Sequence, residues 1–499
     1  MNKDNLNILS EKEFDDILKN TLNTKPPNED IAKSITPWRK AFNTAVLGIA
    51  LSSLVPNILW LNFILPVIGT LLSIAGFRIL RQENTHFRAC YILSAVKAVM
   101  AILNCIFSAT AYSTVEVNHP LGKLLGFAGF VATFLIFIFF TLAIRQTQIK
   151  ANIPVNIKSP VAMIFLYLVI GLLSLLQYSG IIIGWSVIIG YIVIAVNFFR
   201  IPKTLDNAGY VIKPAPVRVH MVFISVCVTL CIIAGVVCGY MFLHNFPMKW
   251  EETPTQEQTE ITEIKEHLLS LGFPERVLDD LSDDDIRACK NTTKFFYETE
   301  EQSVDEEIDF LGLNPDNPET KEIRFTHILL KSDSQHEQWR LIHHFEWING
   351  DDFYGTEAIQ IWSQYAKYKA LVDRNSYSGR VLYTENGKNY ASPFYSFTTE
   401  SYKYDLAVFD KSTQTDMFAN FSFPEGNLRQ RGYVSYSFYL NSDTSTGSWI
   451  NYNHQKTWMQ FPVVSAAESR RKDSTVSNGA FIMILDAFSF FTDTEEFNH

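Results

Sequence analysis

Hydrophobic positions are distributed unevenly along the chain, and the pattern changes near residue 245. Upstream of that point, seven apolar segments are long enough to cross a bilayer, and downstream there is none. The segments run from Pro37 to Val55 and from Ile58 to Leu80, and then over 89–112, 121–144, 159–178, 181–199 and 219–243. The pattern predicts a seven-helix α-helical transmembrane bundle followed by a region outside the membrane.

The number of spans depends on the continuous apolar run 41–80. Thr36-Pro37 offers a hydroxyl N-cap with proline at the first helical position, and Pro56-Asn57 is a turn-forming pair. We therefore divide the run into two helices, of which the first would cover roughly 28 Å. Read as one helix, the run would leave six spans and place the C-terminal half on the other side of the membrane.

Downstream of residue 245 the pattern predicts an α+β domain. Short helices are expected over 256–271, from Pro274 and from Ser282. From about Ile323 the apolar positions alternate with a period of two, and Asn386-Gly387 is a strong hairpin signal. The expected strands are 323–331, 338–348, 356–364, 378–384, 389–398, 403–410, 416–423, 432–440, 448–453, 457–464 and 480–490. They favour a mainly antiparallel β-sandwich or barrel.

These patterns divide the chain into four parts. We expect a cytoplasmic arm (1–36), a seven-span transmembrane domain (37–245), an extracytoplasmic helical neck (246–320) and an extracytoplasmic β-rich domain (321–499).

Charge orients the predicted bundle. Residues 1–245 carry 19 Lys+Arg against 10 Asp+Glu, and the remaining residues carry 23 against 42. The basic residues lie before the first span and in alternate loops, while the loops at Pro56-Asn57, Ser113 to Pro120 and Gln177 to Gly180 contain none. Positively charged loops face the cytoplasm, so the N-terminus is expected inside and the C-terminal domain outside. The acidic outer half argues against a nucleic-acid partner.

The third predicted span carries an internal charge, Lys97. Small or polar residues recur around it at helical spacing: Cys90, Ser94, Ala101, Asn104 and Ser108. We single out Lys97, Ser94 and Asn104 as a membrane-internal polar stripe. It is either a site on a substrate or coupling pathway, or a packing stripe in which the amine reaches a backbone carbonyl or a headgroup.

The seventh span contains Gly235-x-x-x-Gly239, a spacing that lets helices approach closely, and we interpret both glycines as helix-packing residues. Cys227 and Cys231 lie on the same face without histidine or carboxylate companions, so no metal is predicted there. Cys289 is the sole cysteine downstream of residue 245, so that half holds no internal disulfide.

Five aromatic residues of the outer half are candidates for a binding face: Tyr433, Tyr436, Trp449, Tyr452 and Trp458. Such a face would bind an envelope glycan or a peptide. The same residues could equally be core, which is the usual place for alternating aromatics in a sandwich.

Catalytic motifs were sought and none was recognised, and no cofactor is predicted. His343-His344 are consecutive on an expected strand, so their side chains should point to opposite faces and cannot share one metal ion. The aspartates of 279–285 lack the central glycine and terminal glutamate of a calcium-binding loop, and acidic residues at helix starts explain them more simply.

Several stretches resemble an uncharacterised family of multi-pass membrane proteins from Firmicutes, especially clostridia. The matching residues are Thr36-Pro-Trp-Arg-Lys-Ala, Leu61-Asn-Phe-Ile-Leu-Pro-Val-Ile-Gly with Gly76-Phe-Arg, Arg200-Ile-Pro-Lys-Thr-Leu-Asp-Asn-Ala-Gly-Tyr, Pro214-Ala-Pro-Val-Arg and Leu271-Gly-Phe-Pro-Glu-Arg-Val-Leu. They lie in both halves, so the resemblance implies one architecture throughout. It implies no activity and assigns no functional residue.

Three functions compete at this point. The first is a non-enzymatic binding or sensing module of the cell envelope, whose partners would be the lipid bilayer and a glycan, a peptide or another membrane protein. The second is a transporter or transporter accessory subunit that uses the polar stripe around Lys97. The third is a hydrolase of wall polymers, which would need a cleft with convergent carboxylates.

Overall fold

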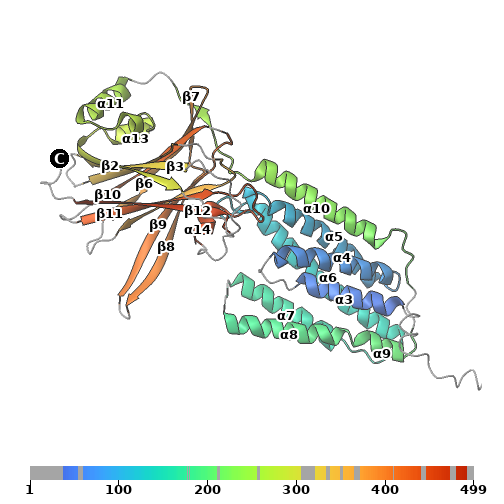
Figure 1. Ribbon diagram of the computed structural model, residues 1–499. Coiled ribbons are helices and arrows are strands. Elements are labelled where there is room, and N and C mark those ends of the chain that lie inside the picture. Colours follow the sequence, from blue (N-terminus) through green and yellow to red (C-terminus); the bar gives the residue numbers. More distant parts are fainter. Residues whose placement is uncertain are drawn as a thin grey trace, which may run out of the picture. The chain divides into compact units, whose positions relative to one another are not determined.

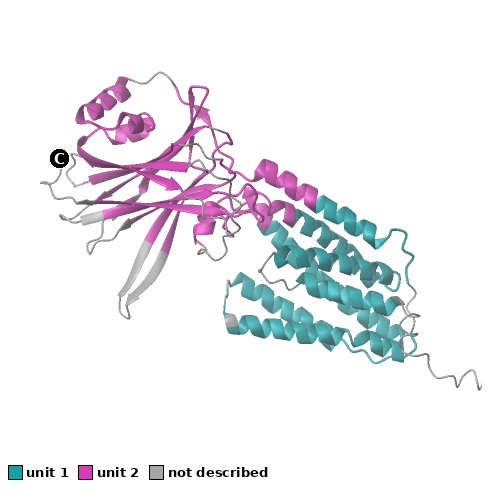
Figure 2. Cartoon of the chain, viewed as in Figure 1, with its two compact units in different colours: residues 1–104, 123–232 teal, residues 105–122, 233–499 magenta. Residues whose placement is uncertain are grey.

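The computed structural model describes residues 37–53, 60–176, 178, 180–210, 214–254, 259–304, 321–332, 338–348, 352–364, 371–407, 410–426, 428–439, 445–471 and 479–491. The arm predicted over 1–36 lies outside these residues. The chain divides into two compact units, 1–104 with 123–232 and 105–122 with 233–499 (Figure 2).

The membrane half consists of helices (Figure 1). They are α3 (Pro37–Ser53), α4 (Leu61–Leu80), α5 (Thr85–Phe107), α6 (Pro120–Lys150), α7 (Lys158–Leu175), α8 (Ile181–Phe198), α9 (Ile201–Asn207) and α10 (Met221–Leu243), with a short 3-10 turn at Ala111–Ser113. Within the described ranges, six helices are long and apolar enough to cross a membrane: α4, α5, α6, α7, α8 with its continuation into α9, and α10. Such helices are typical of a membrane protein.

The apolar run 41–80 forms two helices and not one. α3 ends at Ser53 and α4 begins at Leu61. The two helices pack closely because glycines line the contact: a Cβ on Gly48 would lie 2.3 Å from the backbone nitrogen of Ser73. With 17 residues, α3 is shorter than the six spans named above.

The C-terminal half, residues 246–499, contains two antiparallel sheets. We call it the outer half, or the outer domain, after the side of the membrane expected from the sequence. The seven-stranded sheet has the order β1-β7-β6-β10-β4-β3-β2, and the five-stranded sheet has the order β12-β11-β5-β9-β8. The strands are β1 (Glu251–Glu252), β2 (Thr292–Val304), β3 (Lys321–Ser332), β4 (Gln338–Trp347), β5 (Glu357–Gln364), β6 (Leu371–Glu385), β7 (Lys388–Pro393), β8 (Ser396–Ala407), β9 (Asp410–Phe421), β10 (Arg429–Tyr439), β11 (Ser445–Gln455) and β12 (Phe481–Phe491). The predicted antiparallel β architecture is confirmed, and it is a sandwich.

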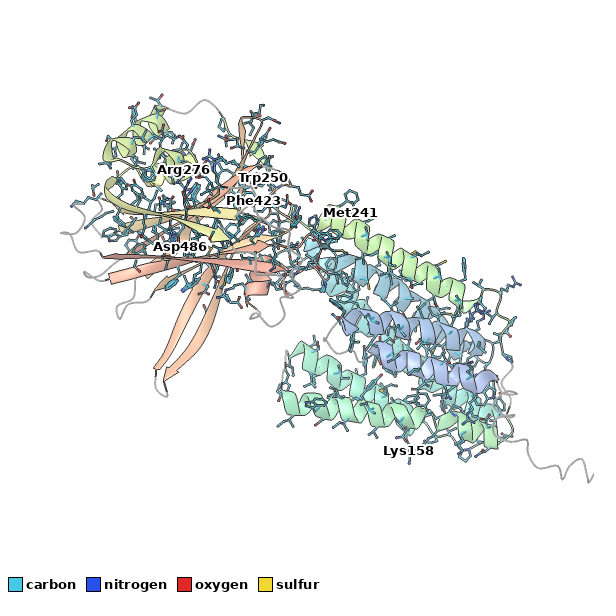
Figure 3. The ribbon with its side chains drawn as sticks, in the orientation of Figure 1. Lys158, Met241, Trp250, Arg276, Phe423 and Asp486 are labelled. Carbon is cyan, nitrogen blue, oxygen red and sulfur yellow. The ribbon has the colours of Figure 1, made fainter. Side chains whose placement is uncertain are left out.

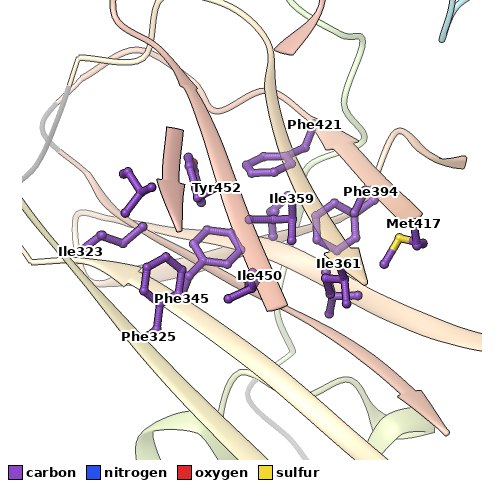
Figure 4. Packing of buried hydrophobic residues seen from close by; sticks show 14 of the residues in the cluster. Ile323, Phe325, Phe345, Ile359, Ile361, Phe394, Met417, Phe421, Ile450 and Tyr452 are labelled. Carbon is purple, nitrogen blue, oxygen red and sulfur yellow. The ribbon is translucent and has the colours of Figure 1, made fainter. Parts of the chain in front are cut away.

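The sandwich core is built from alternate residues of both sheets, as a period of two requires (Figure 4). Phe345 of β4 meets Tyr452 of β11 edge to face, with ring centroids 5.1 Å apart, and lies 5.9 Å from Phe421 of β9. These side chains are fully buried. Aromatic pairs therefore hold the two sheets together near the middle of the sandwich.

Three short helices cover the outer face of the seven-stranded sheet: α11 (Thr259–Leu271), α12 (Glu275–Leu278) and α13 (Asp283–Ala288). Their apolar residues, among them Ile261, Leu268 and Val277, form one core with Ile342 and Tyr433 of the sheet. The segment predicted as a neck is thus a cap on the sheet, and β2, inside the range predicted for that neck, is one of the sheet's edge strands (Figure 1). We call α11–α13 the helical cap.

Three predicted strands have other structures. The stretch 389–398 is divided between β7 and β8, and residues 403–407 of the stretch 403–410 are the end of β8 and not a separate strand. The stretch 457–464 is a loop, in which Val463 packs with Ala109 and Tyr240 and not in a sheet, while Trp458 and Met459 are exposed. A fourth helix, α14 (Ala466–Arg471), follows the loop and packs on the outer side of the five-stranded sheet through Ala466 and Ala467.

The connection between α5 and α6 belongs to the same compact unit as the sandwich. The backbone nitrogen of Val463 donates to the carbonyl of Ser108 at 2.8 Å. The fully buried carboxylate of Glu116 accepts from Ser465 Oγ and from Arg471 Nη1, each at 2.6 Å. Residues 108–116 are therefore fixed to the loop 456–465 and to α14.

Candidate functional site

A cleft of about 580 Å³ lies where the helical cap meets the β1 edge of the seven-stranded sheet. Its walls come from β1 and the residues after it, the start and end of α13, the middle of β6 and the end of β7, with one residue each from β4 and β8. All of these elements are in the outer half. The sequence patterns did not predict this cleft.

The cleft is shaped by an irregular part of β6. Ser378 pairs with Ser435 of β10, but the next pair is Asp373 with Ser437, so residues 374–377 bulge out of the ladder opposite a single residue. Gly379, next to the bulge, has φ 144°, and a Cβ there would lie 2.1 Å from the carbonyl oxygen of Tyr433. A glycine is therefore required at this point, and such bulges re-aim side chains next to functional sites.

The floor of the cleft is a hydrogen-bonded set of polar side chains centred on Asp285. Its Oδ1 accepts from Arg340 Nη2 at 2.6 Å, and its Oδ2 accepts from Tyr433 Oη at 2.5 Å. Arg340 Nη2 also donates to Ser378 Oγ at 2.9 Å. Burial, and then the neighbouring Asp285 carboxylate, raise the pKa of Tyr433, so its phenol stays protonated as a donor. The charges of Arg340 and Asp285 thus balance, and the pair is fixed before any ligand binds. Arg380 also lines the cleft and donates to the carbonyls of Asp280 and Leu281 at 2.8 and 2.9 Å.

The rim of the cleft is acidic. Glu251, Glu252 and Asp284 are exposed there, and the cations near them, Lys388 and Arg287, lie outside the cleft lining. The serines of 376 and 378 and the ring of Tyr377 add hydroxyl groups and an aromatic surface. Such a lining suits a neutral, hydroxylated or cationic ligand better than an anion.

One wall of the cleft belongs to the chain that leaves α10. Phe246 stacks on Tyr395 with centroids 4.8 Å apart, and Trp250 packs against Tyr383 at 4.8 Å and Phe423 at 6.2 Å (Figure 3). The backbone nitrogen of Lys249 donates to Ser392 Oγ at 3.1 Å, and Ser392 itself lines the cleft. Residues 244–254, which follow α10, therefore form an ordered strap, and a ligand in the cleft would touch its last four residues, 251–254.

The polar stripe of α5 is only partly brought together. Lys97 is buried, and its Nζ donates to the carbonyl and hydroxyl of Ser52 in α3 at 3.2 and 3.1 Å. Ser94 is buried, and its hydroxyl has no partner among the described residues. Asn104 is exposed. The Lys97 amine thus reaches a backbone carbonyl, as the packing interpretation expects.

The two glycines of α10 lie against the end of α5. A Cβ on Gly235 would be 2.4 Å from Ile106 Cδ1, and one on Gly239 would be 3.3 Å from the Ile106 carbonyl oxygen. Both positions therefore allow a close helix contact.

The five aromatics of the predicted binding face do not share a face. Tyr433 is buried beneath the helical cap, while Tyr436 and Tyr452 are buried in the sandwich core. Trp449 is partly exposed and stacks on Trp362, with ring centroids 6.0 Å apart. Trp458 lies on the loop 456–465 and is 69% exposed. Alternation along β10 and β11 separates these residues, because neighbouring positions face opposite sides of a sheet.

His343 and His344 point to opposite faces, as predicted. His344 faces the helical cap, where its Nε2 lies 2.9 Å from Asp280 Oδ2. His343 faces the sandwich core. Among the described residues no group of three or more His, Cys, Asp or Glu side chains is arranged to hold a metal ion. The aspartates of 279–285 instead serve the cap: Ser282 is the N-cap of α13 and accepts from the Asp285 nitrogen at 3.2 Å.

His343 belongs to a chain of buried hydrogen bonds that crosses the sandwich. Tyr436 Oη donates to Ser448 Oγ at 2.9 Å, and Ser448 Oγ is 2.8 Å from His343 Nε2. His343 Nδ1 is 2.7 Å from His327 Nδ1, and His327 Nε2 is 2.9 Å from Asp486 Oδ2. If both imidazoles are neutral, each of these four hydrogen bonds has one donor and one acceptor. Tyr436 then donates to Ser448, and Ser448 to His343. His343 in turn donates to His327, and His327 to Asp486. Ser448 is 1% exposed, so this serine–histidine arrangement offers no nucleophile to a substrate.

These buried hydrogen bonds predict that the outer domain loses stability in mild acid. Burial, and then the neighbouring His327, hold the pKa of His343 well below its usual range. An unfolded histidine has a pKa of about 6.5, so below that pH the unfolded chain binds a proton that the folded one refuses, at a cost of up to about 1.4 kcal/mol per pH unit. Urea unfolding between pH 7.5 and about 5 measures the slope. We expect His343→Gln to flatten it, and equal slopes in the two proteins would contradict the assignment.

Comparisons with known proteins identify no relative. No family model matches the chain, and no curated protein matches it. Among solved structures, the KRT10-binding region domain of the pneumococcal serine rich repeat protein PsrP covers 32% of this chain and 87% of its own at 9% identity, with a TM-score of 0.18. AvmM, which catalyses macrocyclization in alchivemycin A biosynthesis, covers 31% and 80% at 8% identity, with a TM-score of 0.18. The Clostridium perfringens NetB toxin in its membrane inserted form covers 41% and 98% at 8% identity, with a TM-score of 0.17. At these scores none of the three supports a shared fold or function.

Proposed function

We propose that the protein is an envelope sensor or binding module whose outer domain takes a ligand into the cleft beside α13. The observation that carries the proposal is the cleft's construction: a fixed polar floor centred on Asp285, next to a wall formed by the strap 244–254. Because the strap continues from α10, a ligand bound there contacts the segment that leads to the membrane. The balanced floor and acidic rim fit a neutral glycan or a peptide without excess negative charge.

We further propose seven spans, with the N-terminus in the cytoplasm and the outer domain outside the cell. The positively charged loops support this orientation. Glu116, in a loop expected outside, is bound to Ser465 and Arg471 of the C-terminal half. Two segments in contact lie on one side of the bilayer, and four apolar helices between them, α6, α7, α8 and α10, agree with that.

The transport alternative has less support. Lys97 is engaged by Ser52, and the cavity between α3, α6 and α8 lined by Ile49, Phe140 and Tyr191 has a volume of about 10 Å³, room for roughly one water molecule.

Binding to a blocked cleft tests the proposal. Ala288 is exposed and lines the cleft, so Ala288→Trp should fill part of it without disturbing the sandwich. The full chain in nanodiscs would be titrated with soluble muropeptides and with a set of short neutral and cationic peptides. We expect one class to bind, and Ala288→Trp to weaken that binding about tenfold or more, which corresponds to about 1.4 kcal/mol.

A matched control is Glu266→Trp, at an exposed position of α11 outside the cleft. It should bind as the unchanged protein does. The proposal fails if neither class binds, or if the two tryptophan variants bind equally well.

A further inference from the structure

The loop 456–465 presents two exposed apolar side chains next to the ends of membrane helices. Trp458 is 69% exposed and Met459 is 40% exposed. Most other large aromatics of the sandwich are buried, so an exposed Trp-Met pair on a short loop needs a reason.

Three contacts fix the position of this loop relative to the ends of α5 and α10. Gln455 Nε2 donates to the carbonyl of Thr457 at 3.0 Å and lies 3.3 Å from Tyr240 Oη, so the residue before Trp458 is joined to the last turn of α10 through one side chain. The backbone nitrogen of Val463 bonds the carbonyl of Ser108, directly after the end of α5. Val463 also packs with Ala109 and Tyr240 in a small apolar core.

These contacts hold the loop beside the last turn of α10, where the apolar helix ends. Met241, Phe242 and Leu243 close α10 and are 65%, 76% and 43% exposed (Figure 3). Side chains this apolar on the last turn of a spanning helix are covered by lipid. The chain then turns polar at His244 and Asn245. Trp458 and Met459 lie on a loop held against this end of α10, and tryptophan is enriched in membrane proteins at the border between acyl chains and headgroups.

We propose that Trp458 and Met459 insert into the interfacial layer of the bilayer, so that the outer domain is held by a lipid-contacting loop as well as by its covalent strap. The partner is the lipid surface itself. The indole ring suits this layer because its apolar body faces the chains while its N–H reaches water or a headgroup. The loop is held at both ends, at Gln455 and at Val463, so little conformational freedom is lost on insertion.

Quenching by brominated lipids tests this placement. The full chain is placed, one copy per nanodisc, in phosphatidylcholine brominated either near the headgroup end of the acyl chain or at the chain terminus, and tryptophan emission is recorded. We expect the fraction of emission quenched by the shallow bromines to fall in Trp458→Phe. It should not fall in Trp449→Phe, which removes an indole that stacks on Trp362 in the five-stranded sheet.

Two outcomes would overturn the proposal. One is equal quenching in the unchanged protein and in Trp458→Phe, which would place the indole in water. The other is emission from Trp458 that lipid bromines do not quench and that changes with the protein concentration, since that would indicate a second copy as the partner. Both variants replace a side chain that is at least partly exposed, and circular dichroism spectra identical to that of the unchanged protein would confirm that they fold.

Discussion

Asp280→Ala is expected to destabilise the outer domain by about 3–5 kcal/mol, because it leaves a buried cation without its partner. Asp280 is 3% exposed and accepts from Arg431 Nε at 2.8 Å and from His344 Nε2 at 2.9 Å. Arg431 is 2% exposed and His344 is fully buried. Without the carboxylate, Arg431 and His344 remain buried between the helical cap and the sheet and lose the acceptor that they share. The melting temperature should fall by roughly 6–20 °C in detergent.

The neighbouring residue gives a matched control. The side chain of Asp279 is 66% exposed and is 3.5 Å from Lys265. An exposed pair of this kind contributes about 0–1 kcal/mol, so Asp279→Ala should leave the melting temperature almost unchanged. Hydrogen exchange over 259–289 locates the damage, since the cap should open before the sandwich does. Equal shifts in the two variants would show that Asp280 does not hold the cap in place.

The same carboxylate adds a pH dependence with a defined sign. Burial alone would raise the pKa of Asp280, but the His344 and Arg431 contacts outweigh burial and lower it. A lowered folded pKa contributes stability above the unfolded value of about 3.9, and that stability is lost as the pH falls through the folded pKa. This loss begins below a pH of about 3.9, whereas the loss assigned to His343 begins below about 6.5, so the two effects have different onsets on a pH axis.

The sequence predicts best those features that depend on local periodicity. The alternation of β4 and β10 predicts strands there because each strand has one face in the sandwich core. The spanning helices are predicted from the length and the apolar composition of their segments. The sequence does not predict β2, because most of its residues are exposed and its apolar positions do not alternate with polar ones. The stretch 457–464 is predicted as a strand because it is apolar, but it is a loop in which Val463 packs against Tyr240 and Ala109 while Trp458 and Met459 are exposed.

The candidate site depends on partners that are distant in sequence. Asp285 meets Arg340 and Ser378, which are 55 and 93 residues away, and no spacing rule joins them. A local signal was present in the run Asn375-Ser-Tyr-Ser-Gly, since a glycine inside a predicted strand indicates a bulge or a close backbone approach. The prediction that the aspartates of 279–285 lie at a helix start holds for Asp283 to Asp285, in the first turn of α13, whereas Asp279 and Asp280 follow the end of α12. Asp280 and Asp285 also bind the sheet, which a local pattern cannot reveal.

Glu116→Ala is the second change with a large expected effect, and it acts on the loop 108–116. The Glu116 carboxylate is fully buried, and the Arg471 side chain that it binds is 14% exposed. Arg471 also bonds Glu400 at 2.7 Å and Thr398 at 2.6 Å, so it joins the loop after α5 to α14 and β8. Breaking a buried pair by removing one partner costs about 3–5 kcal/mol, and we expect the lower end of that range because Arg471 keeps its ion pair with Glu400. Exchange of amides in 108–120 and 463–471 should therefore quicken by about 100-fold or more.

An exposed pair in the same domain serves as the comparison. Lys388 and Glu252 are 3.0 Å apart, but more than half of each side chain is exposed, so Glu252→Ala should alter exchange little. The distinction bears on sensing, because Glu116 provides one of several connections between the outer domain and the ends of α5 and α10. The others are the strap 244–254 and the contacts of Gln455 and Val463. If Glu116→Ala leaves exchange in 108–120 unchanged, the loop is held by the Val463 and Tyr240 contacts alone. A ligand in the cleft could then act on the membrane helices through the strap and through these contacts, and not through Glu116.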